Sequence, residues 1–159
     1  MHGAGTQAEA VRLLLRIWNQ RVGFDPRELD AVLRRTARAR ERLGNGLLES
    51  LTERDRGTAE AIFARFAQVL GPVGAAKALG LLHPTVFVMW DTEIARRYCG
   101  STWRRNAAAA YGRFMSMTAE QARSCRGGRE RFGDELLKVI DERNYCSLTR
   151  RWMKQACTV

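Results

Sequence analysis

Lys77 and Asp91 are the two residues whose chemical types and spacing best suit covalent catalysis. Lys77 is the only charged residue in the apolar run 75–82, and Asp91 follows the run 85–90, which is expected to be extended. Burial penalises the protonated form of an amine, and a neutral lysine amine is a nucleophile that can form a Schiff base with a sugar C1′. A carboxylate at a helix start stays ionised and can stabilise an oxocarbenium-like sugar or shuttle protons. The spacing therefore predicts Lys77 as the nucleophile and Asp91 as its partner.

Each of these two residues also has a purely structural interpretation. The stem of Lys77 can cover apolar surface while its ammonium group reaches water. Asp91 precedes a helical stretch that begins at Thr92, which is the position of an N-cap whose carboxylate accepts hydrogen bonds from free helix amides. The capping role and the catalytic role of Asp91 are compatible.

A glycine-containing turn lies just before Lys77. The residues 70–74 read Leu-Gly-Pro-Val-Gly, and two glycines three positions apart allow a sharp turn that presents N–H groups at the start of the next helix. Such donors bind anions, so we expect Gly71, Val73 and Gly74 to bind a DNA phosphate. An ordinary helix–helix turn is the alternative.

Aromatic residues close to this segment are candidates to stack on a base flipped out of a duplex. Trp90 and Phe87 lie in the run that precedes Asp91. Trp18 is a third candidate, but it lies on the apolar stripe of the first expected helix, where packing is the competing role.

The composition favours a polyanionic partner. The 159 residues carry a formal net charge of +10, and the basic residues are 24 arginines but only three lysines. Dispersed basic residues are typical of proteins that bind nucleic acid, because release of counterions from the phosphates contributes to affinity. We therefore expect DNA as the partner; arginine enrichment from a GC-rich genome is the alternative.

Several other classes of protein are disfavoured. No apolar run approaches the ~20 residues needed to cross a bilayer, and Arg12 and Arg16 interrupt the only apolar stretch near the N-terminus, so neither a membrane span nor a signal peptide is expected. These features predict a cytoplasmic, nucleoid-associated protein. The cysteines are scattered without a C-x-x-C pair, which predicts free buried thiols, no metal site and no cofactor; they are Cys99, Cys125, Cys146 and Cys157.

Apolar residues recur at helical spacing along most of the chain. This pattern predicts an all-α fold, a compact single domain (1–159) built as a bundle of short non-parallel helices. Three capping signals mark helix starts: Asp25 before Pro26, Thr52 with Asp55, and Thr118 with Gln121. The expected helices cover 8–21, 26–43, 53–70, 75–82, 92–98, 104–117, a short stretch after 118, 130–143 and 148–156. Only 85–90 is expected to be extended.

The stretch LGPVGAAKALGLLHPTVFVMWDTEIARR (70–97) resembles the helix-hairpin-helix DNA glycosylase superfamily. It is most similar to the lysine-using 8-oxoguanine DNA glycosylase/AP lyases, including their compact archaeal type. The resemblance implies a helix-hairpin-helix core at about 53–97. It also implies that Lys77 attacks C1′ of the damaged nucleoside, that Asp91 assists, and that the amides of the turn hold a phosphate. No iron–sulfur cysteine cluster follows this stretch.

Three functions are consistent with these observations. The first is a monomeric DNA-repair glycosylase/AP lyase that excises an 8-oxoguanine-like damaged purine from duplex DNA through a lysine Schiff base. The second is a non-catalytic helical module that binds DNA or RNA through the glycine turn and arginine-rich faces. The third is a protein-interaction domain whose arginines keep it soluble.

Overall fold

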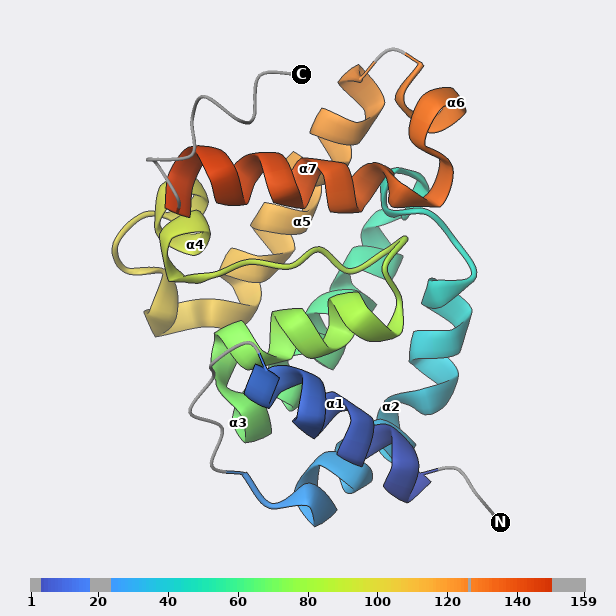
Figure 1. The fold of residues 1–159 in the computed structure, drawn as a ribbon, viewed down its shortest axis with the longest axis vertical. Helices are drawn as coiled ribbons and strands as arrows, with labels where there is room; N and C mark the ends of the chain where they lie inside the picture. The colour runs from blue at the N-terminus through green and yellow to red at the C-terminus, as the bar shows by residue number, and fades with distance from the viewer. Residues whose placement is uncertain (1–3, 18–23, 126, 150–159) are drawn as a thin grey trace.

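Helices make up nearly all of the secondary structure in the computed structural model, which describes residues 4–17, 24–125 and 127–149 (Figure 1). No strand occurs within these ranges, so the predicted all-α class is confirmed. The α-helices are α1 (Ala4–Ile17), α2 (Pro26–Gly44), α3 (Glu53–Leu82), α4 (Thr92–Cys99), α5 (Ala107–Ser124), α6 (Gly128–Phe132) and α7 (Leu136–Asn144). Short 3-10 turns cover Leu48–Ser50, Trp103–Asn106 and Gly133–Glu135, and a π turn covers Tyr145–Thr149.

Two of the three predicted capping signals work as expected. Asp25 caps α2, where its Oδ1 accepts a 2.9 Å hydrogen bond from the amide of Arg27. Thr52 caps α3 in a reciprocal capping box: its Oγ1 accepts from the Asp55 amide at 3.2 Å, and Asp55 Oδ2 accepts from the Thr52 amide at 3.3 Å. These local hydrogen bonds satisfy helix amides that have no partner within the helix.

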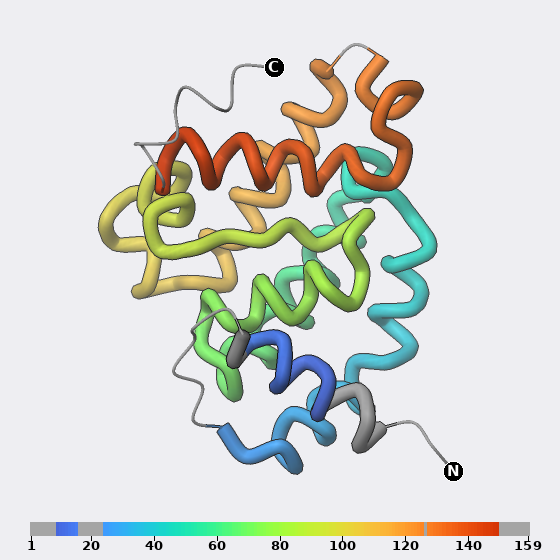
Figure 2. The backbone as a smooth tube through the Cα atoms, in the orientation of Figure 1, coloured from blue at the N-terminus to red at the C-terminus, as the bar shows by residue number. Residues whose placement is uncertain are grey.

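The helix α3 bends sharply at Gly71. This residue has φ 68° and ψ 166°, a conformation that only glycine adopts without strain, and the segments before and after it run in different directions (Figure 2). The predicted turn between two helices is therefore present. It is shorter than expected, since the second segment starts at Pro72 rather than at residue 75. Proline suits a first helical position because its fixed φ is helical and no N–H is required there.

The third capping signal is wrong. Thr118 lies in the middle of α5, is buried, and its hydroxyl donates to the carbonyl of Phe114 at 3.0 Å. The predicted helix 104–117 therefore continues to Ser124. The buried face that includes Ala110, Phe114 and Thr118 packs against the core, and this burial outweighs the local preference of threonine for a helix start.

The predicted helix 130–143 is two helices. Gly133 has φ 52°, which ends α6, and α7 begins after a 3-10 turn. The first helix begins earlier than predicted, at Ala4, while its predicted end at residue 21 lies outside the described residues. Most of the predicted helix 148–156, from residue 150 on, also lies outside them.

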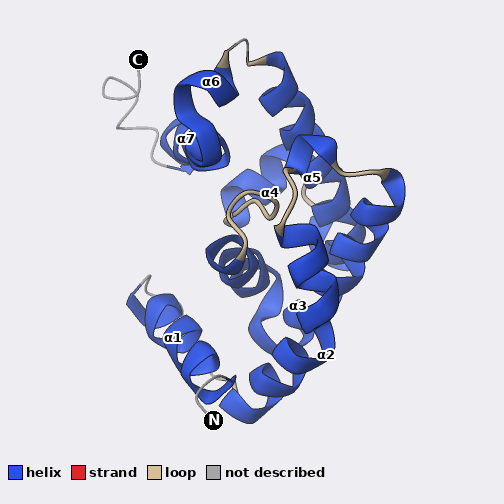
Figure 3. Cartoon of the chain, turned by 90° about the vertical axis from the view of Figure 1, so that its right-hand side faces the viewer, coloured by secondary structure: helices blue, strands red, loops and turns tan. Residues whose placement is uncertain are grey.

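A cluster of aromatic side chains lies at the centre of the domain. The Phe63 and Tyr111 rings stack at 4.0 Å, and Trp90 lies 5.0 Å from Tyr111 and 5.1 Å from Trp103, measured between ring centroids. The Tyr111 hydroxyl donates to the Val88 carbonyl at 2.7 Å. These contacts hold the segment 85–90, which has no strand pairing (Figure 3). Residues 84–86 form a turn, in which the amides of Val86 and Phe87 donate to the His83 carbonyl at 3.2 and 3.0 Å, so the extended part of this loop is shorter than predicted and begins at Phe87. One continuous apolar core includes residues from α1 to α7, in agreement with a single domain.

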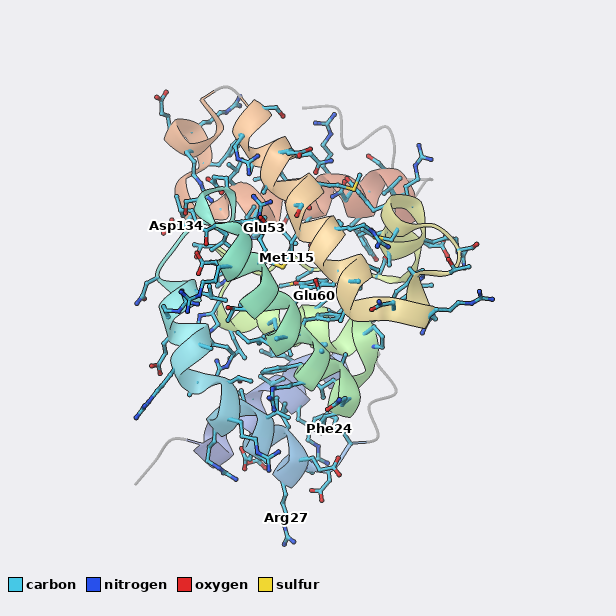
Figure 4. The ribbon with its side chains drawn as sticks, turned by 180° about the vertical axis from the view of Figure 1, so that it is seen from behind. Phe24, Arg27, Glu53, Glu60, Met115 and Asp134 are labelled. Atoms are coloured by element: carbon cyan, nitrogen blue, oxygen red, sulfur yellow. The ribbon has the colours of Figure 1, made fainter. Side chains whose placement is uncertain are left out.

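The extended loop lies between the second segment of α3 and α7 (Figure 1). On the other side of the molecule, the first segment of α3 packs against α2 and α5 (Figure 4). The α3–α5 contact is close at Gly112, where an added Cβ would lie 2.6 Å from Glu60 Oε2. The second segment of α3 and α7 therefore lie on either side of the extended loop, which ends at the start of α4 (Figure 1).

One arginine is buried although the sequence does not single it out. Arg40 of α2 is 5 % exposed and donates to Thr36 Oγ1 at 3.0 Å, to the Leu33 carbonyl at 3.1 Å and to His83 Nε2 at 3.1 Å. Since His83 caps the end of α3, Arg40 ties α2 to the point where the extended loop begins.

Candidate functional site

Lys77 lies on the second segment of α3, between the fully buried residues Ala76 and Ala78. Its side chain is partly exposed. Burial lowers the pKa of Lys77, and the charges of Asp91 and Asp141 oppose this shift by raising it. The structure therefore brings the predicted nucleophile into the electrostatic field of its predicted partner and of a second carboxyl group.

Asp91 is held on both of its carboxylate oxygens. It is the N-cap of α4, where Oδ1 accepts from the amide of Ile94 at 2.8 Å. Oδ2 accepts from the hydroxyl of Thr149 at 2.6 Å. The N-cap interpretation of Asp91 is confirmed, and the second hydrogen bond comes from the turn that follows α7. Hydrogen bonds to both oxygens fix the orientation of the carboxylate.

Asp141 of α7 is a member of this cluster that the sequence interpretation missed. Burial, together with the negative charges of Asp91 and Glu142, raises its pKa to about 7, and the positive charge of Lys77 acts in the opposite direction. Asp141 stands four residues after the buried Leu137, so both lie on the same face of a helix. A carboxylate at this spacing on the apolar face of the expected helix was the available signal.

A cavity of about 450 Å³ lies against this cluster. Its walls come from the end of α3, the extended loop and α7, and Asp141 is among the lining residues. Gly80 and Leu81 also line it; they follow Lys77 by three and four positions, on the same helix face. The absence of a side chain at Gly80 makes room for Met89, since an added Cβ would lie 2.6 Å from Met89 Cγ. The cavity is mostly apolar, with charged groups at one side.

The predicted stacking roles of Trp90 and Phe87 are wrong. Each side chain is 1 % exposed. Trp90 packs among the aromatic cluster, and its indole Nε1 donates to the carbonyl of Pro72 at 3.1 Å. A base cannot stack on a ring whose faces are already covered, so these residues hold the extended loop on the bend of α3. Trp18 lies outside the described residues.

The three residues predicted to bind phosphate lie at the bend of α3. Gly71 and Val73 are partly exposed, whereas Gly74 is buried, and a Cβ on Gly74 would lie 3.0 Å from that of Leu70. Gly74 is therefore a poor position at which to test phosphate binding, because a larger side chain would displace the first segment of the helix. Val73 stands at the start of the second segment, where backbone amides have no partner within the helix.

A second cavity, of about 680 Å³, lies between α4, α5 and α7 and does not include Lys77, Asp91 or Asp141. Its wall is held by a chain of two hydrogen bonds: Gln121 Nε2 donates to the Tyr98 hydroxyl at 2.7 Å, which donates to Asn144 Oδ1 at 2.9 Å. The sequence predicted that Gln121 helps to cap a helix, but in the structure its side chain makes the first of these two hydrogen bonds instead.

The thiols of Cys99, Cys125 and Cys146 are free, and Cys125 is exposed, in contrast to the prediction of buried thiols. Within the residues that the structure describes, no group of three or more His, Cys, Asp or Glu side chains is arranged to hold a metal ion. None of the described helices has the length and apolar character needed to cross a membrane.

The described residues form an all-α domain in which the charges of Lys77, Asp91 and Asp141 act on one another from three helical elements, and Asp141 lines a mostly apolar cavity. Comparison of the chain with protein-family models, with curated proteins and with solved structures found no match.

Proposed function

We propose that this protein is a DNA-repair glycosylase with AP lyase activity, of the helix-hairpin-helix type, which excises an 8-oxoguanine-like damaged purine from duplex DNA. The observation that carries the proposal is the electrostatic interaction of Lys77 with Asp91, combined with burial that lowers the Lys77 pKa. A lysine that loses its proton more readily than usual is the group needed to attack a sugar carbon.

In this mechanism the Lys77 amine attacks C1′ of the damaged nucleoside, the glycosidic bond breaks, and the bonding pair leaves with the base. Ring opening of the sugar then gives an iminium between Lys77 and C1′, which permits strand cleavage. The Asp91 carboxylate, held by Ile94 and Thr149, stabilises positive charge on the sugar. The bend at Gly71 supplies amide donors for a DNA phosphate, and the net charge of +10 favours DNA over neutral polymers.

Trapping of the iminium tests the nucleophile. Borohydride should convert it to a stable adduct between the protein and a duplex that contains 8-oxoguanine or an abasic site. Lys77→Arg should keep DNA affinity and lose both the adduct and base release, because a guanidinium stays protonated and forms no imine. Lys138→Arg is the matched control, since Lys138 is exposed and lines the cavity of about 450 Å³. Retained trapping in Lys77→Arg, or its loss only in Lys138→Arg, would rule out Lys77 as the nucleophile.

Asp91→Asn tests the partner separately. Asparagine keeps an oxygen that can accept from the Ile94 amide, so α4 should stay capped. The charge is lost, and base release should slow by about 10²-fold if the carboxylate acts by electrostatics or proton transfer. An unchanged rate would leave Asp91 with a structural role alone.

A non-catalytic nucleic-acid-binding module is the second candidate. The burial of Trp90 and Phe87 favours it, because the expected stacking surface for a flipped base is missing from these side chains. The exposed arginines on α2 offer a basic surface for phosphates; they are Arg34, Arg35, Arg38 and Arg42. This module would bind DNA or RNA with a steep salt dependence and give no adduct. Absence of any salt-dependent binding would favour the third candidate, a protein-interaction domain.

A further inference from the structure

The second cavity, between α4, α5 and α7, has the size of a small-molecule site. Its volume is about 680 Å³, and sites for small organic ligands usually have volumes of about 300–1,000 Å³. Neither Lys77 nor Asp91 lines this cavity. A ligand in it would therefore occupy a place separate from the residues to which we assign catalysis.

Two arginines are the only charged residues among the described residues that line the second cavity. Arg97 lies in the last turn of α4, and Arg143 lies in the last turn of α7. Neither guanidinium forms an ion pair with a carboxylate of the described residues. Glu93, four positions before Arg97, is instead paired with Arg96 at 3.0 Å between Oε1 and Nη1. The wall of the cavity therefore carries two positive charges without a paired acid.

Two guanidinium groups at one cavity suit a phosphate monoester. A guanidinium binds phosphate oxygens with paired N–H donors, and a phosphate monoester carries a charge of about −1.5 to −2 near pH 7. A carboxylate or a phosphodiester carries one negative charge and would balance only one of the two arginines. A positive charge in the last turn of a helix also complements the carbonyl end of that helix, which is the competing structural role. That role does not require both arginines to line the same cavity.

Hydrogen bonds hold the walls of the second cavity together. The Tyr98 hydroxyl accepts from Gln121 Nε2 at 2.7 Å and donates to Asn144 Oδ1 at 2.9 Å, which links α4, α5 and α7. The Thr149 hydroxyl donates to Asp91 Oδ2 at 2.6 Å and ties the turn after α7 to the start of α4 (Figure 1). A site whose walls are already in place loses less conformational entropy when a ligand binds.

The other side chains of the wall suit an aromatic ring with polar edges. Met117 is 41 % exposed and lines the cavity together with Ile140 and Leu148. Methionine adapts to the shape of a ligand, and its sulfur makes favourable contacts with aromatic rings. Gln121 Oε1 is buried and has no hydrogen-bond partner within the described residues. A buried acceptor without a partner costs free energy, and a donor on a ligand in the cavity that Gln121 lines can offset this cost.

Two serine hydroxyls border the same cavity. Ser124 and Ser147 are both exposed and lie at the end of α5 and in the turn after α7. The Ser124 hydroxyl donates to the Gln121 carbonyl at 3.0 Å, which leaves its oxygen able to accept. A serine hydroxyl donates one hydrogen bond and accepts others, so it can pair with the hydroxyls of a sugar.

We propose that the second cavity is a binding site for a free nucleoside monophosphate. Arg97 and Arg143 bind the phosphate, the two serine hydroxyls pair with the sugar, and the base packs against Met117. This inference goes beyond the proposed function and does not depend on Lys77. It therefore stands or fails separately from the glycosylase proposal.

The thiol of Cys125 is a reporter of occupancy, because it is free, exposed and lines the cavity. The full chain is treated with iodoacetamide in the presence of AMP, GMP, CMP or UMP, and peptide mass spectrometry gives the alkylation rate at each cysteine. At about ten times its Kd, at least one nucleotide should slow the reaction of Cys125 by about 10-fold. Cys146, which does not line the cavity, is the internal control and should keep its rate.

The matching nucleosides and inorganic phosphate test which parts of the ligand are needed. A nucleoside lacks the charge that the two arginines bind, and inorganic phosphate lacks the body that packs against the wall. Both should protect Cys125 much less than the nucleotide does. The inference would be overturned if none of the four nucleotides protected Cys125 at millimolar concentrations, or if inorganic phosphate protected it equally well.

Substitution of the arginines tests the phosphate contacts by isothermal titration calorimetry. Arg97→Gln and Arg143→Gln should each raise the Kd of the nucleotide by about 10- to 100-fold, the range for hydrogen bonds to charged groups. Arg35→Gln is the matched control, since Arg35 is exposed on α2, does not line the cavity, and its loss changes the net charge equally. An equal Kd in all three variants would leave the arginines with a role at the helix ends alone and would overturn the inference.

A strand of DNA is the alternative occupant, because its phosphates are also anions. The same alkylation assay with a single-stranded and a duplex oligonucleotide separates the two cases. Stronger protection of Cys125 by an oligonucleotide than by any mononucleotide would assign the cavity to a nucleic-acid surface and overturn the nucleotide site. These measurements use the wild-type chain, so they decide the question even if an arginine variant does not fold.

Discussion

The hydroxyl of Thr149 donates a 2.6 Å hydrogen bond to Oδ2 of Asp91, although the two residues are 58 positions apart in the chain. The turn after α7 therefore reaches back to the start of α4. Because the Ile94 amide occupies the other oxygen, this contact fixes the carboxylate from two sides. A side chain held in this way keeps one orientation without reorganisation during a reaction.

Removal of this hydroxyl should affect activity more than stability. Thr149→Val keeps the shape of the side chain but removes the donor, which should cost about 1 kcal/mol of stability. Under the proposed glycosylase mechanism, base release should fall by roughly 10-fold, because a less restrained Asp91 carboxylate would stabilise the sugar cation less well. Thr149→Ser, which keeps the donor, is the control, and single-turnover kinetics provide the measurement. Equal rates for the valine and serine variants would contradict this role.

Replacement of Asp141 should alter how stability depends on pH. The folded pKa of Asp141 is about 7, above the ordinary value, so the folded state holds a proton that the unfolded chain loses at lower pH. The resulting stabilisation is complete below about pH 4 and is lost as pH rises through about 7. Asp141→Asn should thus be more stable than the wild type at pH 8, by on the order of 2 kcal/mol, and should lose this advantage at low pH. Denaturant titrations at several pH values test this; a constant difference would contradict it.

The Arg40–His83 contact should produce the opposite pH dependence. A guanidinium only donates, so His83 Nε2 accepts, and the ring is neutral with its proton on Nδ1. Burial and the charge of Arg40 lower the His83 pKa. Because the folded pKa of His83 is lowered, its neutral ring contributes fully to the stability of the fold above the unfolded-state pKa of about 6.5. This contribution is lost as the pH drops below that value.

His83→Gln isolates this effect. Glutamine keeps an acceptor for Arg40 but does not titrate, so its stability relative to the wild type should improve by about 1 kcal/mol between pH 7 and pH 5. Since Asp141 and His83 act in opposite directions in this range, each variant has to be compared with the wild type at the same pH. A difference that is independent of pH would show that the His83 proton is not coupled to folding.

Replacement by alanine should have opposite effects on stability at two glycines of α3. An added Cβ meets no atom within 4 Å at either Gly57 or Gly71, so steric clash does not distinguish them. Gly71 has φ 68° and ψ 166°, and alanine there should cost about 1–3 kcal/mol. Gly57 has no positive φ, and alanine there should stabilise the helix by about 0.5–1 kcal/mol. Thermal unfolding of the two variants tests the bend, and a stabilised Gly71→Ala would contradict its backbone geometry.

The sequence alone determined those features that depend on a few neighbouring residues. Asp25 and Thr52 start helices because their side chains accept from amides two or three positions later. Gly71 and Pro72 together place a turn inside an otherwise helical stretch, because one permits a positive φ and the other starts a helix. The all-α class could be predicted for the same reason, because helical periodicity depends only on residues three or four positions apart.

Only the tertiary structure decided which side chains are buried and which charged groups interact. The hydroxyl of Thr118 suits a helix cap, and the flat ring of Trp90 suits a stacking surface. Packing of the core nevertheless buries both side chains. Asp141 gains its raised pKa from burial and from Asp91, 50 positions earlier, which no local pattern reveals. Burial and charge interactions depend on distances in space, and these distances are set only when the whole chain has folded.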